Sequence, residues 1–257
     1  WLSRLSEREG NAQAAWRTDP KKSGKSSVMG DIGTHAAHLA EYITGAKITD
    51  ICAELNTLVE GRVMDDDGAV LLKFDNGAKG VLMASQVAAG EENALKIRVY
   101  GENGGIEWAQ HEPNTLLVKW YDQPTQVYRA GGNYGAHLSP TAIHNCRTPG
   151  GHPEGYLEAF ANIYRNFALT IGCKIDGTAP TPEMLDFPGI GLDKFARKSP
   201  CTFHRCGSLC CSLKRWHHSS ITQNRIPSWL HSQIRTVRNF DRSIDFRISN
   251  RWHANHL

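Results

Sequence analysis

The feature that most constrains the fold is the dipeptide Asn76-Gly77, which separates two runs of alternating apolar and polar residues. The first run covers residues 69–74 and the second covers residues 80–87. An Asn-Gly pair between such runs predicts a β-hairpin, because the type I′ turn needs positive φ at both central positions. The two runs are therefore expected to be neighbouring antiparallel strands.

The same two-residue period recurs in five other segments, residues 47–59, 95–100, 106–108, 114–120 and 125–128. Tight turns join most of these segments, which favours antiparallel pairing. Alternation leaves one face of the sheet apolar, and a helix is the natural cover for such a face. The expected fold class is α/β of the α+β kind, with an open, mainly antiparallel sheet covered by helices on one face.

A helix is expected on each side of these strands, over residues 30–45 and 156–171. In the first, Asp31 suits the positive end of the helix dipole, and Gly45 can adopt the left-handed cap. Its apolar stripe consists of Ile32, Ala36, Leu39, Ala40 and Ile43. The second helix is expected to end at Gly172. Its apolar side consists of Leu157, Phe160, Ala161, Tyr164, Phe167, Ala168 and Ile171.

Polar side chains follow the first helix at intervals of three and four residues: Asp31, His35, His38 and Glu41. Such spacing places them near one another on the helix surface. Two carboxylates and two imidazoles fit acid–base chemistry on a substrate. They also fit a metal-dependent hydrolase or lyase site. A non-catalytic oligomerisation domain is the third interpretation left open.

Composition changes abruptly near residues 190–200. Residues 197–257 hold 11 Lys and Arg against two acids, a net of +9 in a chain whose total is +3. They also contain four of the seven cysteines, but the spacing of Cys206, Cys210, His217 and His218 matches no common zinc finger. A basic nucleic-acid arm is the other functional alternative. We interpret residues 191–257 as an aberrant or disordered tail after a domain of residues 1–190.

Cysteine usage and hydropathy bear on the compartment. Seven unevenly spaced cysteines in 257 residues do not resemble a disulfide scaffold, which favours a reducing, cytoplasmic setting. No apolar run approaches the roughly 18 residues of a membrane helix. The first residue, Trp1, is neither an initiator Met nor part of a signal-peptide pattern, so the sequence is expected to begin within a longer protein. Neither a membrane nor a nucleic acid is expected as partner.

Four blocks of sequence together resemble the C-terminal domain of the Gfo/Idh/MocA oxidoreductases, the glucose–fructose oxidoreductase and inositol dehydrogenase family. They are residues 16–20 with 30–35, residues 90–101, residues 150–164 and residues 186–190. The resemblance covers about residues 1–190. It implies oxidation of a sugar or polyol hydroxyl with NAD or NADP as cofactor. It also implies a homo-oligomer that assembles through the sheet face.

The resemblance also implies roles for individual residues. Asp31 and His35 match the Asp-x-x-x-His motif of the family's active site. His35 would accept the hydroxyl proton and Asp31 would orient and polarise it. An imidazole is apt for this role because it titrates near working pH. Substrate contacts are expected at Trp16, Arg17, His38, His152 and Glu154.

Three features depart from the family pattern. No Gly-x-Gly-x-x-Gly follows a strand, so we expect this sequence to lack the Rossmann domain and to hold no cofactor-binding residue. The family's catalytic lysine, carried by that domain, has no counterpart, so the chain is expected to be inactive alone. After residues 186–190 the family's closing helix is replaced by the basic tail, which we interpret as the product of a frame shift.

Overall fold

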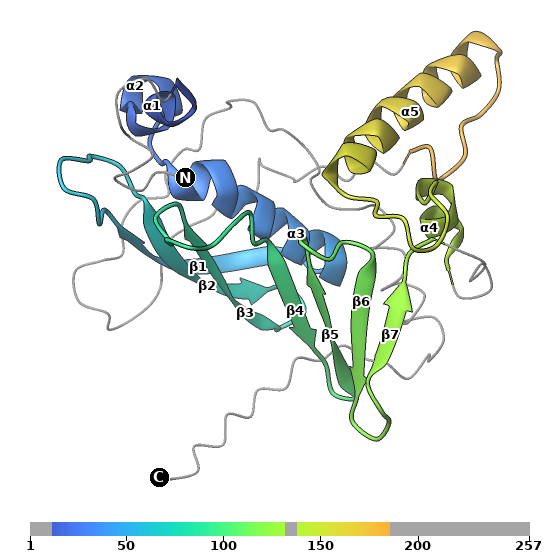
Figure 1. Cartoon of the computed structure of the whole chain (residues 1–257), viewed down its shortest axis with the longest axis horizontal. Helices are drawn as coiled ribbons and strands as arrows, with labels where there is room; N and C mark the ends of the chain where they lie inside the picture. The colour runs from blue at the N-terminus through green and yellow to red at the C-terminus, as the bar shows by residue number, and fades with distance from the viewer. Residues whose placement is uncertain (1–11, 132–137, 186–257) are drawn as a thin grey trace. The chain divides into compact units, whose positions relative to one another are not determined.

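The computed structural model describes residues 12–131 and 138–185 (Figure 1). The elements in chain order are α1 (Ala12–Thr18), α2 (Pro20–Ser23), the π-helical turn η1 (Met29–Gly33), α3 (Thr34–Thr44), β1 (Ile48–Asn56), β2 (Asp67–Phe74), β3 (Lys79–Ser85), β4 (Lys96–Tyr100), β5 (Gly104–Ala109), β6 (Thr115–Trp120), β7 (Gln126–Arg129), α4 (Pro140–Asn145) and α5 (Tyr156–Ile175). The expectations for residues 186–190 and for the tail 191–257 lie outside the described residues.

The seven predicted strands are all present, and every pairing between them is antiparallel. The mixed α/β class with antiparallel sheets is therefore confirmed. One feature differs from the expected single sheet. Hydrogen bonds join the strands into a three-stranded sheet, β1-β2-β3, and a four-stranded sheet, β4-β5-β6-β7.

The hairpin predicted from Asn76-Gly77 connects β2 to β3, but its turn is not the expected two-residue type. Lys73 pairs with Lys79, so the connection is longer than a type I′ turn allows. Gly77 adopts φ of 85°, and Ala78 donates its N–H to Asn76 Oδ1 at 3.1 Å. The Asn side chain therefore closes a local turn of its own, and the glycine provides the left-handed residue of a longer loop.

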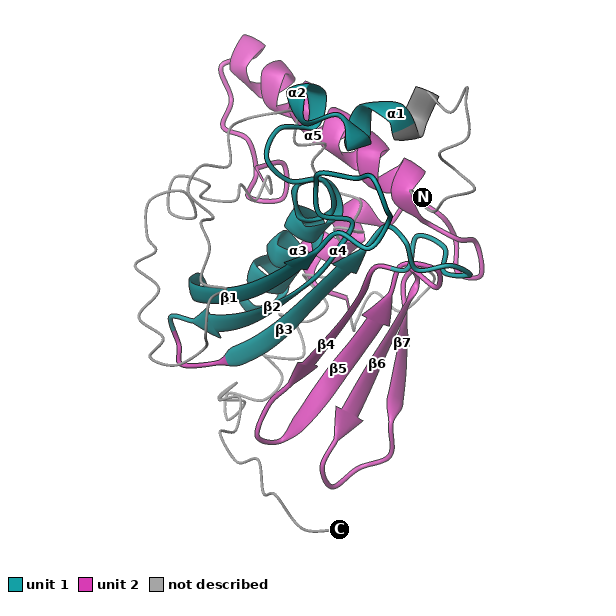
Figure 2. Ribbon diagram, turned by 90° about the vertical axis from the view of Figure 1, so that its left-hand side faces the viewer, with its two compact units in different colours: residues 1–75, 79–94, 188–223 teal, residues 76–78, 95–187, 224–257 magenta. Residues whose placement is uncertain are grey.

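The chain divides into two compact units, each built around one sheet (Figure 2). The described part of unit 1 comprises residues 12–75 and 79–94, and that of unit 2 comprises residues 76–78, 95–131 and 138–185. No helix among the described residues is long and apolar enough to cross a bilayer.

In unit 1, η1 and α3 contact the three-stranded sheet, mainly through β3. Leu39 and Ile43 are buried on α3, whereas Ile32, Ala36 and Ala40 of the predicted stripe are only half-buried. Gly68 on β2 permits this close approach. A Cβ at that position would lie 2.7 Å from Met29 Cε, a distance that real Cβ atoms do not show.

In unit 2, the four-stranded sheet buries Trp108, Leu116 and Val118. The indole Nε1 of Trp108 donates to the carbonyl oxygen of Pro113 at 3.0 Å, as a buried indole requires. The helix predicted over residues 156–171 runs through Gly172 to Ile175. An interior glycine costs a helix only about 1 kcal/mol, so the expectation that Gly172 would end it was wrong.

Candidate active site

The helix expected from residue 30 begins with a π-helical turn. Thr34 donates its backbone N–H to the carbonyl oxygen of Met29, five residues earlier, before α3 continues as a regular α-helix. Asp31 thus lies within η1 and does not cap α3, whose N-cap position is Gly33. A π-turn changes the direction in which its side chains point, and such turns are frequent at functional sites. Gly45 takes the predicted left-handed cap, with φ of 69°.

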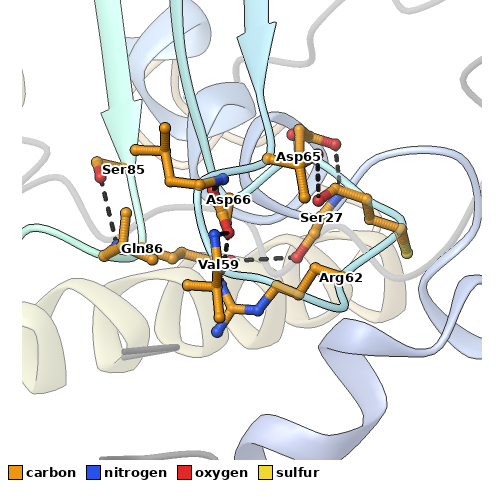
Figure 3. Close-up of polar contacts among 11 residues, drawn as sticks. Ser27, Val59, Arg62, Asp65, Asp66, Ser85 and Gln86 are labelled. Carbon is orange, nitrogen blue, oxygen red and sulfur yellow. Dashed lines mark hydrogen bonds and ion pairs between the residues drawn. The ribbon is translucent and has the colours of Figure 1, made fainter. Parts of the chain in front are cut away.

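Asp65, at the end of the β1–β2 connection, holds the segment that leads into η1 (Figure 3). Its carboxylate accepts the backbone N–H groups of Ser27 at 2.9 Å and Met29 at 3.0 Å, and the hydroxyl of Ser26 at 3.0 Å. Its carbonyl oxygen accepts the N–H of Val28 at 3.1 Å. A carboxylate distant in sequence therefore satisfies the N–H groups at the start of the turn.

The neighbouring Asp66 is fully buried and organises the β1–β2 connection. It accepts the N–H groups of Leu58 at 2.8 Å and Val59 at 3.0 Å, and the Arg62 guanidinium at 2.9 Å. Burial lowers the pKa of Arg62, and the charge of Asp66 and its hydrogen bond oppose that shift. The pair fixes the loop that carries Asp65.

The carboxylate of Asp31 is engaged through one oxygen. Arg17 Nε donates to Oδ2 at 2.6 Å and Gln86 Nε2 donates to the same oxygen at 2.8 Å. The Arg17 guanidinium also lies 4.4 Å from the centroid of the Trp16 ring. The structure thus brings together three predicted site residues, Trp16, Arg17 and Asp31. Among the described residues, no hydrogen-bond donor reaches Asp31 Oδ1.

Gln86 is the principal residue of this site that the sequence did not reveal. It follows β3, is buried, and donates its backbone N–H to the carbonyl oxygen of Asp66 at 2.9 Å. Its side-chain Oε1 accepts the hydroxyl of Ser27 at 3.1 Å. A glutamine at a strand end has no local pattern that marks it, so only the fold places it beside Asp31.

His35 and His38 follow Asp31 on α3, and both are half-buried. The His38 and Tyr42 rings lie 5.9 Å apart in a tilted arrangement. Glu41, the fourth member of the proposed metal quartet, accepts the N–H of Ile48 at 2.8 Å and Lys47 Nζ at 3.3 Å. Within residues 12–131 and 138–185, no three His, Cys, Asp or Glu side chains are arranged to hold a metal ion. The Glu41 carboxylate is engaged by the residues at the start of β1.

His152 and Glu154 belong to unit 2 and lie on the loop before α5. Glu154 is buried, and its Oε1 accepts the N–H of Arg147 at 2.8 Å. Asn114 ties both residues to β6: it donates to the carbonyl oxygen of His152 and accepts the N–H of Glu154, each at 2.9 Å. The His152 side chain is exposed. The Glu154 carboxylate thus serves loop structure here, and Glu158 takes the N–H of Gly155 at the helix start.

Comparison with known proteins supports the resemblance inferred from the motifs. Residues 3–107 match the profile of the GFO/IDH/MocA C-terminal domain. Over this span, which is less than half of the chain, the sequence is similar to that domain. The matched span contains Trp16, Arg17, Asp31, His35 and Gln86, the residues that surround η1.

Proteins similar to this chain include an oxidoreductase and an inositol dehydrogenase homolog. The chain is 33% identical over 166 residues to the uncharacterized oxidoreductase YfiI of Bacillus subtilis strain 168, covering 64% of this chain and 42% of the relative. An inositol dehydrogenase homolog from Azotobacter vinelandii, solved with NAD+, is 35% identical with a TM-score of 0.60, covering 65% of this chain and 43% of that one. The same homolog solved with NADH and myo-inositol is 34% identical with a TM-score of 0.57, covering 64% and 42%.

The chain spans less than half the length of these relatives. The family, the fold class and the oxidoreductase character of the relatives are as the motifs predicted. The roles of individual site residues stay predictions.

Proposed function

We propose that this chain supplies the substrate-binding part of an NAD- or NADP-dependent oxidoreductase that oxidises a hydroxyl group of a sugar or polyol. The observation that carries the proposal is the geometry at Asp31. One carboxylate oxygen is anchored by Arg17 and Gln86, and no donor from the described part of the chain occupies the other, which can accept a hydrogen bond. The inositol dehydrogenase homolog solved with NADH and myo-inositol supports the substrate class.

In this proposal, Asp31 Oδ1 accepts a hydrogen bond from the substrate hydroxyl and orients it. His35, one turn further along the helix, takes the hydroxyl proton as general base. Arg17 contacts Asp31, and its guanidinium lies over the Trp16 ring. In this proposal the two residues form the edge of the sugar site, where the other face of the indole can stack on the apolar face of a sugar. His38 is a further proposed substrate contact in this unit, and substrate contacts at His152 and Glu154 of unit 2 stay predictions.

The nicotinamide cofactor, which accepts the hydride when bound, has no binding fold in the described residues. Their strand pairings are all antiparallel, whereas a dinucleotide site is built on a parallel βαβ unit. We therefore assign cofactor binding to chain outside these residues. The 257-residue chain alone is expected to bind neither NAD+ nor NADP+ in calorimetric titration, and tight binding would contradict this assignment.

The activity is tested with the product of the complete gene that encodes this sequence. It is incubated with NAD+ or NADP+ and a panel of sugars and polyols that includes myo-inositol, and formation of the reduced nicotinamide is followed. His35→Ala is expected to lower turnover about 10²- to 10⁴-fold, the range of a general base. His111→Ala, at an exposed position of unit 2, is the matched control. Full activity of His35→Ala would refute the assigned role.

The same preparation separates the metal alternative. Stoichiometric zinc or manganese, together with loss of activity on chelation, would favour a hydrolase or lyase. Absence of turnover with every substrate in a protein that still assembles would favour the oligomerisation domain instead.

We also propose that the chain forms a homo-oligomer through the three-stranded sheet. The side chains of Leu71, Val81 and Met83 are 58%, 66% and 76% exposed on β2 and β3. Leu71 pairs with Val81, and their face is opposite the buried Val70 and Leu82. Large apolar side chains gathered on one sheet face are typical of a protein–protein interface.

Light scattering after size-exclusion chromatography tests the sheet-face interface. Val81→Lys combined with Met83→Lys is expected to reduce the molar mass of the wild-type oligomer to that of the monomer. Val63→Lys is the control, because Val63 is equally exposed but lies in the β1–β2 connection. A wild-type monomer, or an oligomer that survives the double substitution, would contradict the proposal.

A further inference from the structure

We propose that Gln86 is a positioning residue that fixes the Asp31 carboxylate, and that Ser27 sets the orientation of the Gln86 side chain. Ser27 Oγ donates to Gln86 Oε1 at 3.1 Å, and Gln86 Nε2 donates to Asp31 Oδ2 at 2.8 Å. The inference rests on the role proposed for Asp31 and extends it to residues that the sequence motif does not include.

The direction of this hydrogen-bond chain follows from the chemistry of its members. A carboxylate oxygen accepts hydrogen bonds, so the Gln86 atom facing Asp31 must be the amide nitrogen. The amide oxygen then faces Ser27, whose hydroxyl can donate to it. Ser27 itself is held by its backbone N–H, which donates to Asp65 Oδ1 at 2.9 Å. Each group in the chain therefore has a single orientation that satisfies its neighbours.

Gln86 is fixed at both ends, which makes it suitable for positioning. Its backbone N–H donates to the carbonyl oxygen of the fully buried Asp66, and its side chain is buried between Ser27 and Asp31. Arg17, by contrast, belongs to α1 and keeps 26% of its side chain exposed. A neutral donor held in the interior can restrict the carboxylate plane while a half-buried cation supplies charge.

The consequence concerns the second oxygen of Asp31. Because both donors converge on Oδ2, Oδ1 is the oxygen that can meet a substrate hydroxyl, and its direction is set by the plane that Gln86 fixes. A misplaced acceptor lowers the rate of the reacting complex more than it lowers affinity. Loss of Gln86 is therefore expected to affect kcat more than KM.

The first experiment needs no activity. In the 15N-labelled 257-residue chain, the side-chain amide signals of Gln86 are assigned by their absence in Gln86→Met. Both Asp31→Asn and Ser27→Ala are expected to shift these signals, because each removes one hydrogen-bond partner of the amide. Gln123→Met, at an exposed position between β6 and β7, should leave them unchanged. Gln86 signals that respond to neither substitution would overturn the proposal.

The second experiment uses the complete gene product with NAD+ and a polyol that the enzyme oxidises. Gln86→Met is expected to lower kcat about 10- to 100-fold, the scale of one hydrogen bond to a charged group, with a smaller change in KM. In an Asp31→Asn background, the same substitution should cost about twofold or less, because its effect passes through Asp31. Thermal unfolding of each variant measures any general loss of stability.

The outcomes are distinct. The inference is overturned if the kcat losses of Gln86→Met and Asp31→Asn multiply in the double variant. It is also overturned if kcat changes only in step with thermal stability, because Gln86 would then have a structural role. If the wild-type gene product oxidises no polyol, the proposed function fails, and the Gln86 amide signals alone decide whether the hydrogen-bond chain exists.

Discussion

The helices α3 and α5 have similar apolar patterns but bury opposite kinds of surface. On α3, Leu39 and Ile43 are buried beside the carboxylate of Glu41. On α5, the buried residues are Ala159, Asn162 and Asn166, whereas the apolar side predicted from the sequence is largely exposed, with Phe167 at 59%. A helical period thus predicts a helix and its stripe, but it does not state which side faces the interior of its own unit.

The polar contacts explain the orientation of α5. Asn162 Nδ2 donates to the carbonyl oxygen of Asn145 at 2.8 Å, and Asn166 Oδ1 lies 2.8 Å from His144 Nε2. These contacts join α5 to the short helix α4 through amides and an imidazole. By contrast, α3 is held to its sheet by burial of apolar side chains. Its one buried carboxylate, Glu41, accepts the N–H of Ile48 at the start of β1. The difference predicts that α3 tolerates truncation far less than α5.

The largest expected difference is between two core-type truncations. Leu39→Ala removes a side chain that is 1% exposed and should lower the free energy of unfolding by about 2–5 kcal/mol. Phe167→Ala on α5 should change it by no more than about 0.5 kcal/mol, because that ring already contacts solvent. Urea denaturation followed by circular dichroism measures both. Equal losses would show that another surface covers α5 in solution.

The buried carboxylate of α3 gives the next effect. Glu41→Ala leaves the N–H of Ile48 without its acceptor and should cost about 1–3 kcal/mol of unfolding free energy. Glu41→Gln is the matched control, since its amide oxygen can still accept that N–H, and most of the loss should be recovered. If both variants lower the free energy of unfolding equally, the charge of Glu41, rather than its hydrogen bond, holds α3 to β1.

These cases show why the fold was more predictable than the site. Strand positions follow from alternation over a few residues, so the predicted bounds lie within three residues of those of β1 to β7. Asp31, by contrast, is held by Arg17, 14 residues before it, and Gln86, 55 residues after it. The family motif identified Asp31 and His35. Local pattern could not reveal Asp65 or Gln86, because the partners of their side chains lie far away in the sequence.

The amide contacts of α5 should each be worth less than the carboxylate of α3. Asn162→Ala removes one hydrogen bond to the carbonyl oxygen of Asn145 and is expected to cost about 1 kcal/mol. The cost stays small because, among the described residues, no donor reaches the buried Asn162 Oδ1. The same urea denaturation measures this loss of unfolding free energy. Asn103→Ala is the control, because Asn76 closes a turn and Asn76→Ala would disturb that turn. If Asn162→Ala lowered the free energy of unfolding as much as Glu41→Ala, the amide contacts of α5 would stabilise the fold as strongly as the buried carboxylate of α3.

The smallest effect concerns Cys146, which follows α4 in the same polar region. Burial raises the pKa of its thiol to about 11, and the negative charge of Glu154 adds to the shift. The folded state therefore favours the thiol, and this contribution to stability is lost as pH rises from the ordinary cysteine value through about 11. Because the thiolate is the nucleophile, alkylation of Cys146 near pH 8 should be about 100-fold slower in the folded chain than in urea. Peptide mass spectrometry measures the two rates. Glu154→Gln should raise only the folded rate, and a folded rate equal to that in urea would show that Cys146 is neither buried nor close to Glu154.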